Sequence, residues 1–180
     1  ALEGLDAGAR DLDVGRPLRA DEPAAVWLRA RNLEQVGMAL HRVDPEILMR
    51  KEGSVEAMDS LDVELIEPDR RWRRTLDGAA DGLTFAGHVE LPEGAPGVYV
   101  VGVTGKTLRA QVPVVISDIT VASHRQGGDV LVYVQDRRRS RPVSGARILL
   151  SDGASVFAEG RTGSDGTWLY RPEPEQETTP

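Results

Sequence analysis

The chain has 180 residues, of which 40% are hydrophobic, and a net charge of −7. This length allows one large domain or two of ordinary size, and the negative charge argues against a general nucleic-acid surface, which needs excess positive charge to displace counterions. The chain has no cysteine, which excludes disulfides, cysteine-ligated metals, a cysteine nucleophile and a thioester formed by a cysteine within it.

Alternating apolar residues first predict strands at residues 25–43. Residues 25–30 and 35–43 both alternate between apolar and polar or small side chains, and a short polar connection separates them. Two such runs joined by a short connection predict two strands that pair with each other.

A short helix follows at residues 45–53. Asp44 is a good N-cap, Pro45 suits the first helical turn, and Gly53 is a typical end point, so the pattern predicts one or two turns. The acidic segment 54–71 has weak periodicity and is interpreted as a loop with some local helix or a short strand.

Further alternating segments predict four strands in the rest of the first half. Residues 77–82 form a turn between the first two, and Pro113 suggests that the last strand is at a sheet edge or carries a bulge. The predicted strands are residues 72–76, 83–92, 94–105 and 106–117.

A new set of strands begins after Asp118. It contains the segments 119–125, 129–137, 146–152, 155–162 and 167–171. Turn signals recur every 8–12 residues or so, the spacing expected of β-sandwiches. We therefore predict an all-β chain of two tandem antiparallel sandwiches of immunoglobulin or fibronectin type, divided near residue 117.

The second predicted domain, residues 118–180, is expected to be incomplete. Five strands make a marginal sandwich, and the Pro/Glu-rich tail at 172–180 cannot bury a core. The chain is therefore expected to be part of a longer protein. No run reaches the roughly 20 apolar residues of a membrane-spanning helix, so no membrane span is expected in this chain.

The candidates for metal or acid–base chemistry are few. His41, His88 and His124 are the only histidines, and no two have the spacing of metal ligands. We interpret them as half-exposed strand residues. The pairs Asp152-Gly153 and Asp165-Gly166 lack the register of a calcium loop and are interpreted as hairpin turns.

The glycines of the segment 145–170 are likewise interpreted as points where the chain reverses. No motif ties a serine, a histidine and an aspartate together. We predict no catalytic residue, no cofactor-binding residue and no metal site in this chain.

Two clusters of arginine could bind phosphate or an anionic glycan. Both flank predicted turns, which favours a solvated loop or a contact between subdomains. Trp72, inside the first cluster, could stack on a sugar, but a lone tryptophan beside a strand belongs more often to the core. The clusters are Arg70, Arg71, Arg73 and Arg74, and Arg137, Arg138, Arg139 and Arg141.

The order of motifs over residues 30–171 resembles one protein family. LPEGAPGVYVVGVTG, then VVISDI, VLVYVQDRRRSRPVSGARILLSDG and FAEGRTGSDGTW look like the tandem macroglobulin domains of bacterial α2-macroglobulins. RNLEQVGMALHRVDPEIL is similar to an earlier strand–turn–strand of that family. Single pieces of this pattern also occur in other sandwiches, so it is the ordered combination that carries the resemblance.

The resemblance implies a large extracytoplasmic protease trap built from a string of sandwiches. The chain contains no recognisable bait segment and no Cys-Glu-Gln thioester motif, so only the scaffold role carries over. The expected partners are neighbouring macroglobulin-like domains of the same polypeptide, and a target protease through the full-length protein.

Two other hypotheses stay open. One is a cell-surface adhesin or carbohydrate-binding module that uses Trp27, Trp72 or Trp168 on an exposed face. The other is a hydrolase that uses His88 or His124 with nearby carboxylates. A glycan-binding assay tests the first of these hypotheses against the scaffold role, and activity-based probing tests the second.

Overall fold

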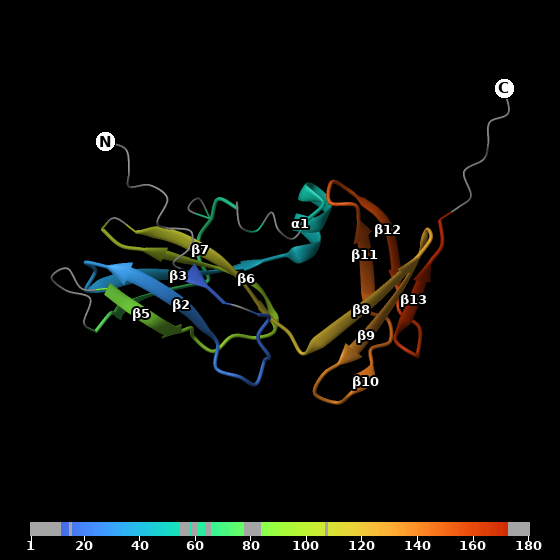
Figure 1. Ribbon diagram of the computed structural model, residues 1–180, viewed down its shortest axis with the longest axis horizontal. Helices are drawn as coiled ribbons and strands as arrows, with labels where there is room; N and C mark the ends of the chain where they lie inside the picture. Colours follow the sequence, from blue (N-terminus) through green and yellow to red (C-terminus); the bar gives the residue numbers. More distant parts are fainter. Residues whose placement is uncertain are drawn as a thin grey trace, which may run out of the picture. The chain divides into compact units, whose positions relative to one another are not determined.

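The fold is built almost entirely of antiparallel strands, with one short helix, which confirms the predicted all-β class (Figure 1). The described residues form two compact units that divide between Ser117 and Asp118. The computed structural model describes residues 12–14, 16–54, 58, 61–63, 66–77, 84–106 and 108–172.

The first unit has two sheets, with strand orders β1-β2-β5 and β4-β3-β6-β7. Its strands correspond to the runs of alternating residues in the sequence, except for the two-residue β1. The elements are β1 (Leu12–Asp13), β2 (Ala25–Arg31), β3 (Gln35–Val43), α1 (Pro45–Glu52), β4 (Arg70–Thr75), β5 (Thr84–Glu90), β6 (Gly97–Thr104) and β7 (Arg109–Ile116).

The predicted pairing of residues 25–30 with 35–43 is wrong. β2 pairs with β1 and β5, whereas β3 pairs with β4 and β6, so the two strands belong to different sheets. Between them Asn32 adopts a left-handed conformation, with φ of 58°, and Leu33 is buried. The short connection therefore carries the chain from one layer to the other instead of closing a hairpin.

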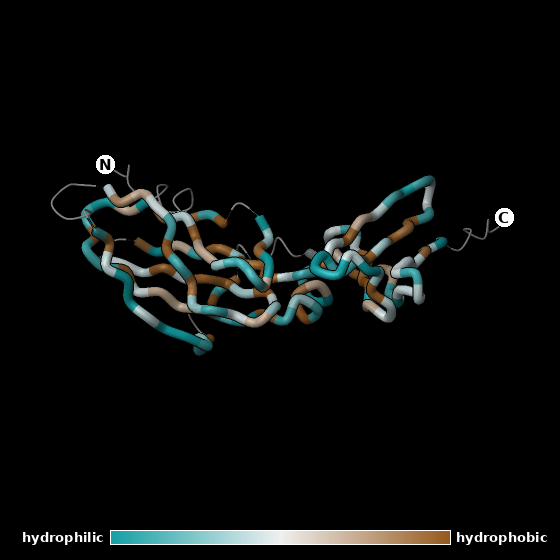
Figure 2. Tube along the Cα trace, turned by 90° about the horizontal axis from the view of Figure 1, so that it is seen from below, coloured by the Kyte–Doolittle hydropathy of each residue, from teal (hydrophilic) through white to brown (hydrophobic). Residues whose placement is uncertain are grey.

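The main core of the first unit is formed by the inward residues of both sheets. Apolar and polar residues alternate along much of the trace (Figure 2). Burying one such aliphatic side chain contributes about 1.5–3 kcal/mol. The buried residues include Val26, Leu28, Val36, Met38, Leu40, Val89, Tyr99, Val101, Val103, Val112, Val114 and Ile116.

β6 and β7 are consecutive strands that pair antiparallel, from Thr104 opposite Arg109 to Gly97 opposite Ile116. β7 is the last strand of its sheet, which confirms the edge position predicted from Pro113. Proline has no N–H to give to a further strand, so an edge tolerates it. Nearby, the Leu18 N–H donates to the Val115 carbonyl at 2.8 Å, and the Ser117 N–H donates to the Leu18 carbonyl at 2.8 Å.

A second, smaller core lies on the other face of the sheet β4-β3-β6-β7. There Val100 of β6 is fully buried under Leu48 of α1, Met58 and Val63. The predicted helix is confirmed with its caps: Asp44 Oδ1 accepts the amides of the first turn, and Gly53 ends the helix at φ of 71°. Much of the predicted turn at 77–82 and part of the segment 54–71 lie outside the described residues.

The second unit contains the five predicted strands and a two-residue strand too short to be seen in the sequence. β9 pairs with β8 along one edge and with β13 and β10 along the other, and β11 and β12 form a separate hairpin. The elements are β8 (Ile119–Gln126), β9 (Asp129–Asp136), β10 (Arg141–Pro142), β11 (Arg147–Ser151), β12 (Val156–Arg161) and β13 (Thr167–Tyr170).

The core of the second unit is small. Val132 and Val134 of β9 are buried, and the Trp168 ring packs against Gly160 of the β11–β12 hairpin. Val121 of β8 is opposite Val134 and shares its face, yet its side chain is 59% exposed. The described residues therefore leave the core-facing side of β8 uncovered.

Candidate functional site

The three histidines lie at separate places in the fold. His88 on β5 and His124 on β8 are exposed, whereas His41 on β3 is only 5% exposed. The prediction of a half-exposed residue is therefore wrong for His41, because the second core covers its face of the sheet. Among the described residues no group of His, Asp or Glu has an arrangement that could hold a metal ion.

His41 is also a buried polar group without a full set of partners. Its Nδ1 atom is buried and has no hydrogen-bond partner. Burial lowers the pKa of His41 below its ordinary value, and the nearby Arg71 guanidinium lowers it further, while Asp69 opposes both effects. The imidazole is thus held in its neutral form at pH 7.

The Asp-Gly pairs form turns, as predicted. The Asp152 carboxylate accepts the amides of residues 154 and 155, both at 2.9 Å, and Gly153 has φ of 96°. Asp165 accepts the Thr167 amide at 2.9 Å, and Gly166 has φ of 76°. These amides lower the pKa of both carboxyls, whose oxygens accept their hydrogen bonds within the turns.

The glycines of this segment are not all corners. Gly145, Gly153 and Gly166 have positive φ, as chain reversal requires, but Gly160 lies inside β12. A Cβ at Gly160 would be 2.1 Å from Cε2 of Trp168, so this glycine makes room for an indole. The interpretation as a turn is wrong here.

The second arginine cluster surrounds the predicted turn after β9. Asp136 Oδ1 accepts the amides of Arg138 and Arg139, and the Arg139 guanidinium donates to Asp136 Oδ2 at 2.9 Å. These hydrogen bonds lower the pKa of Asp136. The cluster therefore includes an internal ion pair that stabilises the turn.

The first arginine cluster lies in a strand and not in a turn. Arg70 to Arg74 belong to β4, which is the last strand of its sheet. Period-two alternation puts Trp72 on the side of the main core, where it packs, and Arg71 and Arg73 on the opposite, outer face. The position of Trp72 agrees with the core interpretation.

The other two tryptophans also lie apart. Trp27 on β2 is half-buried and opposite His88 of β5, on the face of the sheet that points away from the main core. Trp168 packs over Gly160 in the second unit. The three rings therefore do not share one strand or one face.

A groove that the sequence did not reveal runs along the outer face of β4-β3-β6-β7. Strand register places Arg73, Gly37 and Thr104 in one row, and Arg71, Ala39 and Gly102 in the next. Beyond Gly102, the next strand contributes a glutamine, whose side-chain amide donates to the Leu61 carbonyl at 2.9 Å. Small residues thus form the floor between polar walls.

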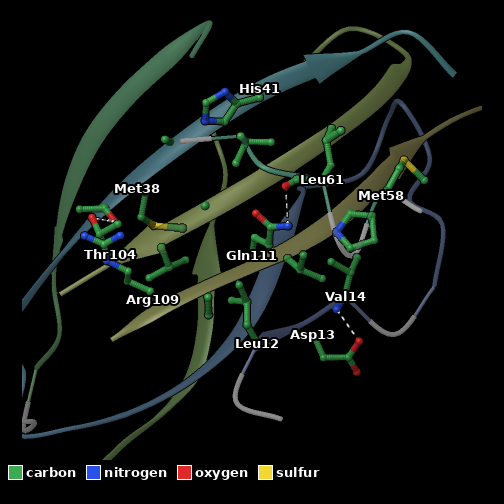
Figure 3. A pocket seen from close by; sticks show the side chains of 18 of the residues that line it. Leu12, Asp13, Val14, Met38, His41, Met58, Leu61, Thr104, Arg109 and Gln111 are labelled. Atoms are coloured by element: carbon green, nitrogen blue, oxygen red, sulfur yellow. Dashed lines mark hydrogen bonds between the residues drawn. The ribbon is translucent and has the colours of Figure 1, made fainter. Parts of the chain in front are cut away.

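The groove is part of a cavity of about 1510 Å³ (Figure 3). His41, Met58, Leu61, Thr104, Arg109 and Gln111 line it, among others. Gly102 is the most open point of the floor, because no atom of the described residues lies within 4 Å of the position that a Cβ would take. The pairing of β3 with β4 and β6, and of β6 with β7, brings the lining residues of these four strands together.

The described residues contain no helix with the length and apolar character that a bilayer crossing requires. No protein-family model matches the sequence. Over 83 residues, 45% of this chain, the sequence is 30% identical to the alpha-2-macroglobulin of Ralstonia nicotianae, of which the match covers 5%. The chain thus spans a small part of that relative.

Solved structures share the fold over most of the chain. A crystal structure of native alpha-2-macroglobulin from Escherichia coli spanning domains NIE-MG1 has a TM-score of 0.67 at 18% identity, covering 94% of this chain and 90% of that one. A second, spanning MG0-NIE-MG1, has a TM-score of 0.66 at 17% identity, covering 89% and 56%. By sequence this chain is similar to part of a bacterial alpha-2-macroglobulin, and it shares the β-sandwich fold of macroglobulin-like domains.

Proposed function

We propose that this chain forms non-catalytic structural domains of a bacterial alpha-2-macroglobulin-like protein that traps proteases outside the cytoplasm. Residues 1–117 and 118–180 are two macroglobulin-like domains. They hold neighbouring macroglobulin-like domains of the same polypeptide in place and transmit its closure around a target protease. The match to the Ralstonia nicotianae protein and the fold shared with the Escherichia coli fragment support this role.

The packing of the first unit is the observation that carries the proposal. The main core covers one face of the sheet β4-β3-β6-β7, and the smaller core under α1 covers part of the other. A close-packed interior deforms little and transmits strain, which is what a scaffold requires. The histidines, by contrast, lie on three different strands and do not meet.

The test uses the polypeptide that carries this chain, with trypsin as the protease. Val101→Ala removes part of a fully buried side chain and weakens the core by about 1–3 kcal/mol. Val121→Ala makes the same chemical change at an exposed position and is the matched control. Compaction after trypsin addition is followed by small-angle X-ray scattering, and trapping by residual activity on a protein substrate.

The scaffold role predicts slower or incomplete compaction for Val101→Ala and unchanged behaviour for Val121→Ala. Equal compaction and trapping in both variants and the parent, with the weaker core verified by urea unfolding, would overturn it. Saturable glycan binding that Trp27→Ala abolishes without unfolding would instead favour the carbohydrate-binding alternative.

A further inference from the structure

The groove on the outer face of β4-β3-β6-β7 has features that a purely mechanical role does not use. We propose that it is a binding site for an extended, acidic peptide segment, whose carboxylates pair with Arg71 and Arg73 while its backbone lies over Gly102. The partner is defined by this chemistry: alternating acidic side chains on a β-like backbone.

The floor of the groove allows a backbone to approach. Gly37, Ala39 and Gly102 are the outward residues at the centre of the sheet, and they lie in neighbouring rows of the register. Within the described part of the chain, a Cβ at Gly102 would meet no atom within 4 Å, so the space above this point is open. Larger side chains on these two strands would keep another chain away from the sheet.

One wall of the groove has the spacing of an extended peptide. Arg71 and Arg73 are two residues apart on the outer face of β4, which separates them by roughly 6.6 Å along the strand. Alternate side chains of an extended peptide have the same separation. Neither arginine forms an ion pair with another described residue, and the pairing partner of β4 within that part of the chain is β3 alone.

The charge of the cavity favours an acidic partner. Among the described residues that line it, four are arginines and two are aspartates, in a chain whose net charge is −7. One of these aspartates, Asp13, accepts the amide of Val14 at 2.7 Å, and Arg16 is paired with Glu22 at 2.7 Å. Arg109 on β7 also has interactions of its own within the chain. Arg71 and Arg73 are therefore the positive groups best placed to attract a ligand.

His41 is an unsatisfied polar group beside the cavity. It lines the same cavity, is 5% exposed, and its buried Nδ1 atom has no partner among the described residues. Buried polar groups in folded proteins are nearly always hydrogen-bonded. The burial of this atom shields it from the groove as well as from solvent, so the proposal depends on the wall arginines and the open floor.

The size of the cavity also favours a peptide over a small metabolite. Its volume of about 1510 Å³ exceeds the roughly 300–1,000 Å³ of typical small-molecule sites. A sulfated oligosaccharide would satisfy the arginines, but it has no strand-like period to match Arg71 and Arg73. We therefore commit to the peptide and use the oligosaccharide as an outcome of the test.

The test measures binding of a fluorescein-labelled eight-residue peptide of alternating Glu and Thr to the 180-residue chain by fluorescence anisotropy. Arg71→Gln with Arg73→Gln removes both wall charges, and Arg70→Gln with Arg74→Gln removes the same charge from the other face of the same strand. We expect about tenfold weaker binding for the first pair, as two exposed ion pairs supply, and less than twofold for the second.

Gly102→Leu fills the floor without touching a charge. Because the space above Gly102 is open, this variant is expected to fold normally and to abolish binding. Thermal unfolding verifies the fold of each variant. The peptide in which Gln replaces Glu, and one with the same residues in two blocks, should both bind at least tenfold more weakly.

Several results would overturn the proposal. These are no saturable binding of the Glu-Thr peptide up to millimolar concentration, an equal loss in the two arginine pairs, or undiminished binding by a folded Gly102→Leu variant. Binding of a heparin-derived hexasaccharide that depends on Arg71 and Arg73, without comparable peptide binding, would assign the groove to anionic glycans instead.

Discussion

Gly160 gives the sharpest test of how the second unit is held together. A Cβ at this position would lie 2.1, 2.2 and 2.5 Å from three atoms of the Trp168 indole, whereas ordinary contact begins near 3.4 Å. Gly160→Ala must therefore shift the ring by more than about 1 Å. That ring joins the hairpin of β11 and β12 to the larger sheet, beside an edge-to-face contact between Phe157 of β12 and Tyr170 of β13.

We expect Gly160→Ala to cause a large loss of folding stability, although it adds a single methyl group. Forcing one extra methyl group into a packed site costs about 1–3 kcal/mol. The second unit has few buried side chains with which to compensate, so we expect a loss of about 2 kcal/mol, or roughly a 30-fold shift in the unfolding equilibrium. An ordinary glycine in a strand would behave in the opposite way, because alanine restricts the unfolded chain.

Gly102→Ala is the matched control. Gly102 also lies inside a strand, but its Cβ would meet nothing within 4 Å, so this variant should be neutral or gain up to about 1 kcal/mol. Urea unfolding measures the stability, and amide hydrogen exchange locates the change in β11, β12 and β13. Equal effects of the two substitutions, or unchanged protection of those strands in Gly160→Ala, would refute the packing argument.

Two further predictions follow from buried polar groups. Burial lowers the pKa of His41, so on acidification the unfolded chain binds a proton more readily than the folded chain does. The free energy of unfolding should therefore fall as the pH drops below about 6.5. His41→Leu should remove this part of the pH dependence, which urea titrations at pH 7.5 and pH 5 measure. Thr162 is buried and donates to the Val143 carbonyl at 2.6 Å while accepting the Ala146 amide at 2.9 Å. Thr162→Val should lower the free energy of unfolding by about 1–3 kcal/mol, whereas Thr120→Val at an exposed position should change it little. Equal losses of stability in the two variants would contradict the stabilising role of the Thr162 hydrogen bonds.

Local sequence patterns were sufficient for much of the secondary structure. The strands β2 to β9 and β11 to β13, the caps of α1 and the turns at Asp152 and Asp165 all follow from rules that act within a few residues. Capping, left-handed glycine and period-two alternation are local effects, so neighbouring residues alone encode them. β1 and β10 escaped prediction because two residues carry no period.

The tertiary structure decided everything that depends on which strands meet. Alternation in β2 and β3 is the same whether they pair or face each other across a core, and only the buried Leu33 and the pairing with other strands resolve it. The burial of His41, the room left by Gly160 and the groove between Arg71 and Gly102 likewise arise from residues distant in sequence. The period of a strand shows that it has two faces, but long-range packing determines what covers each of them.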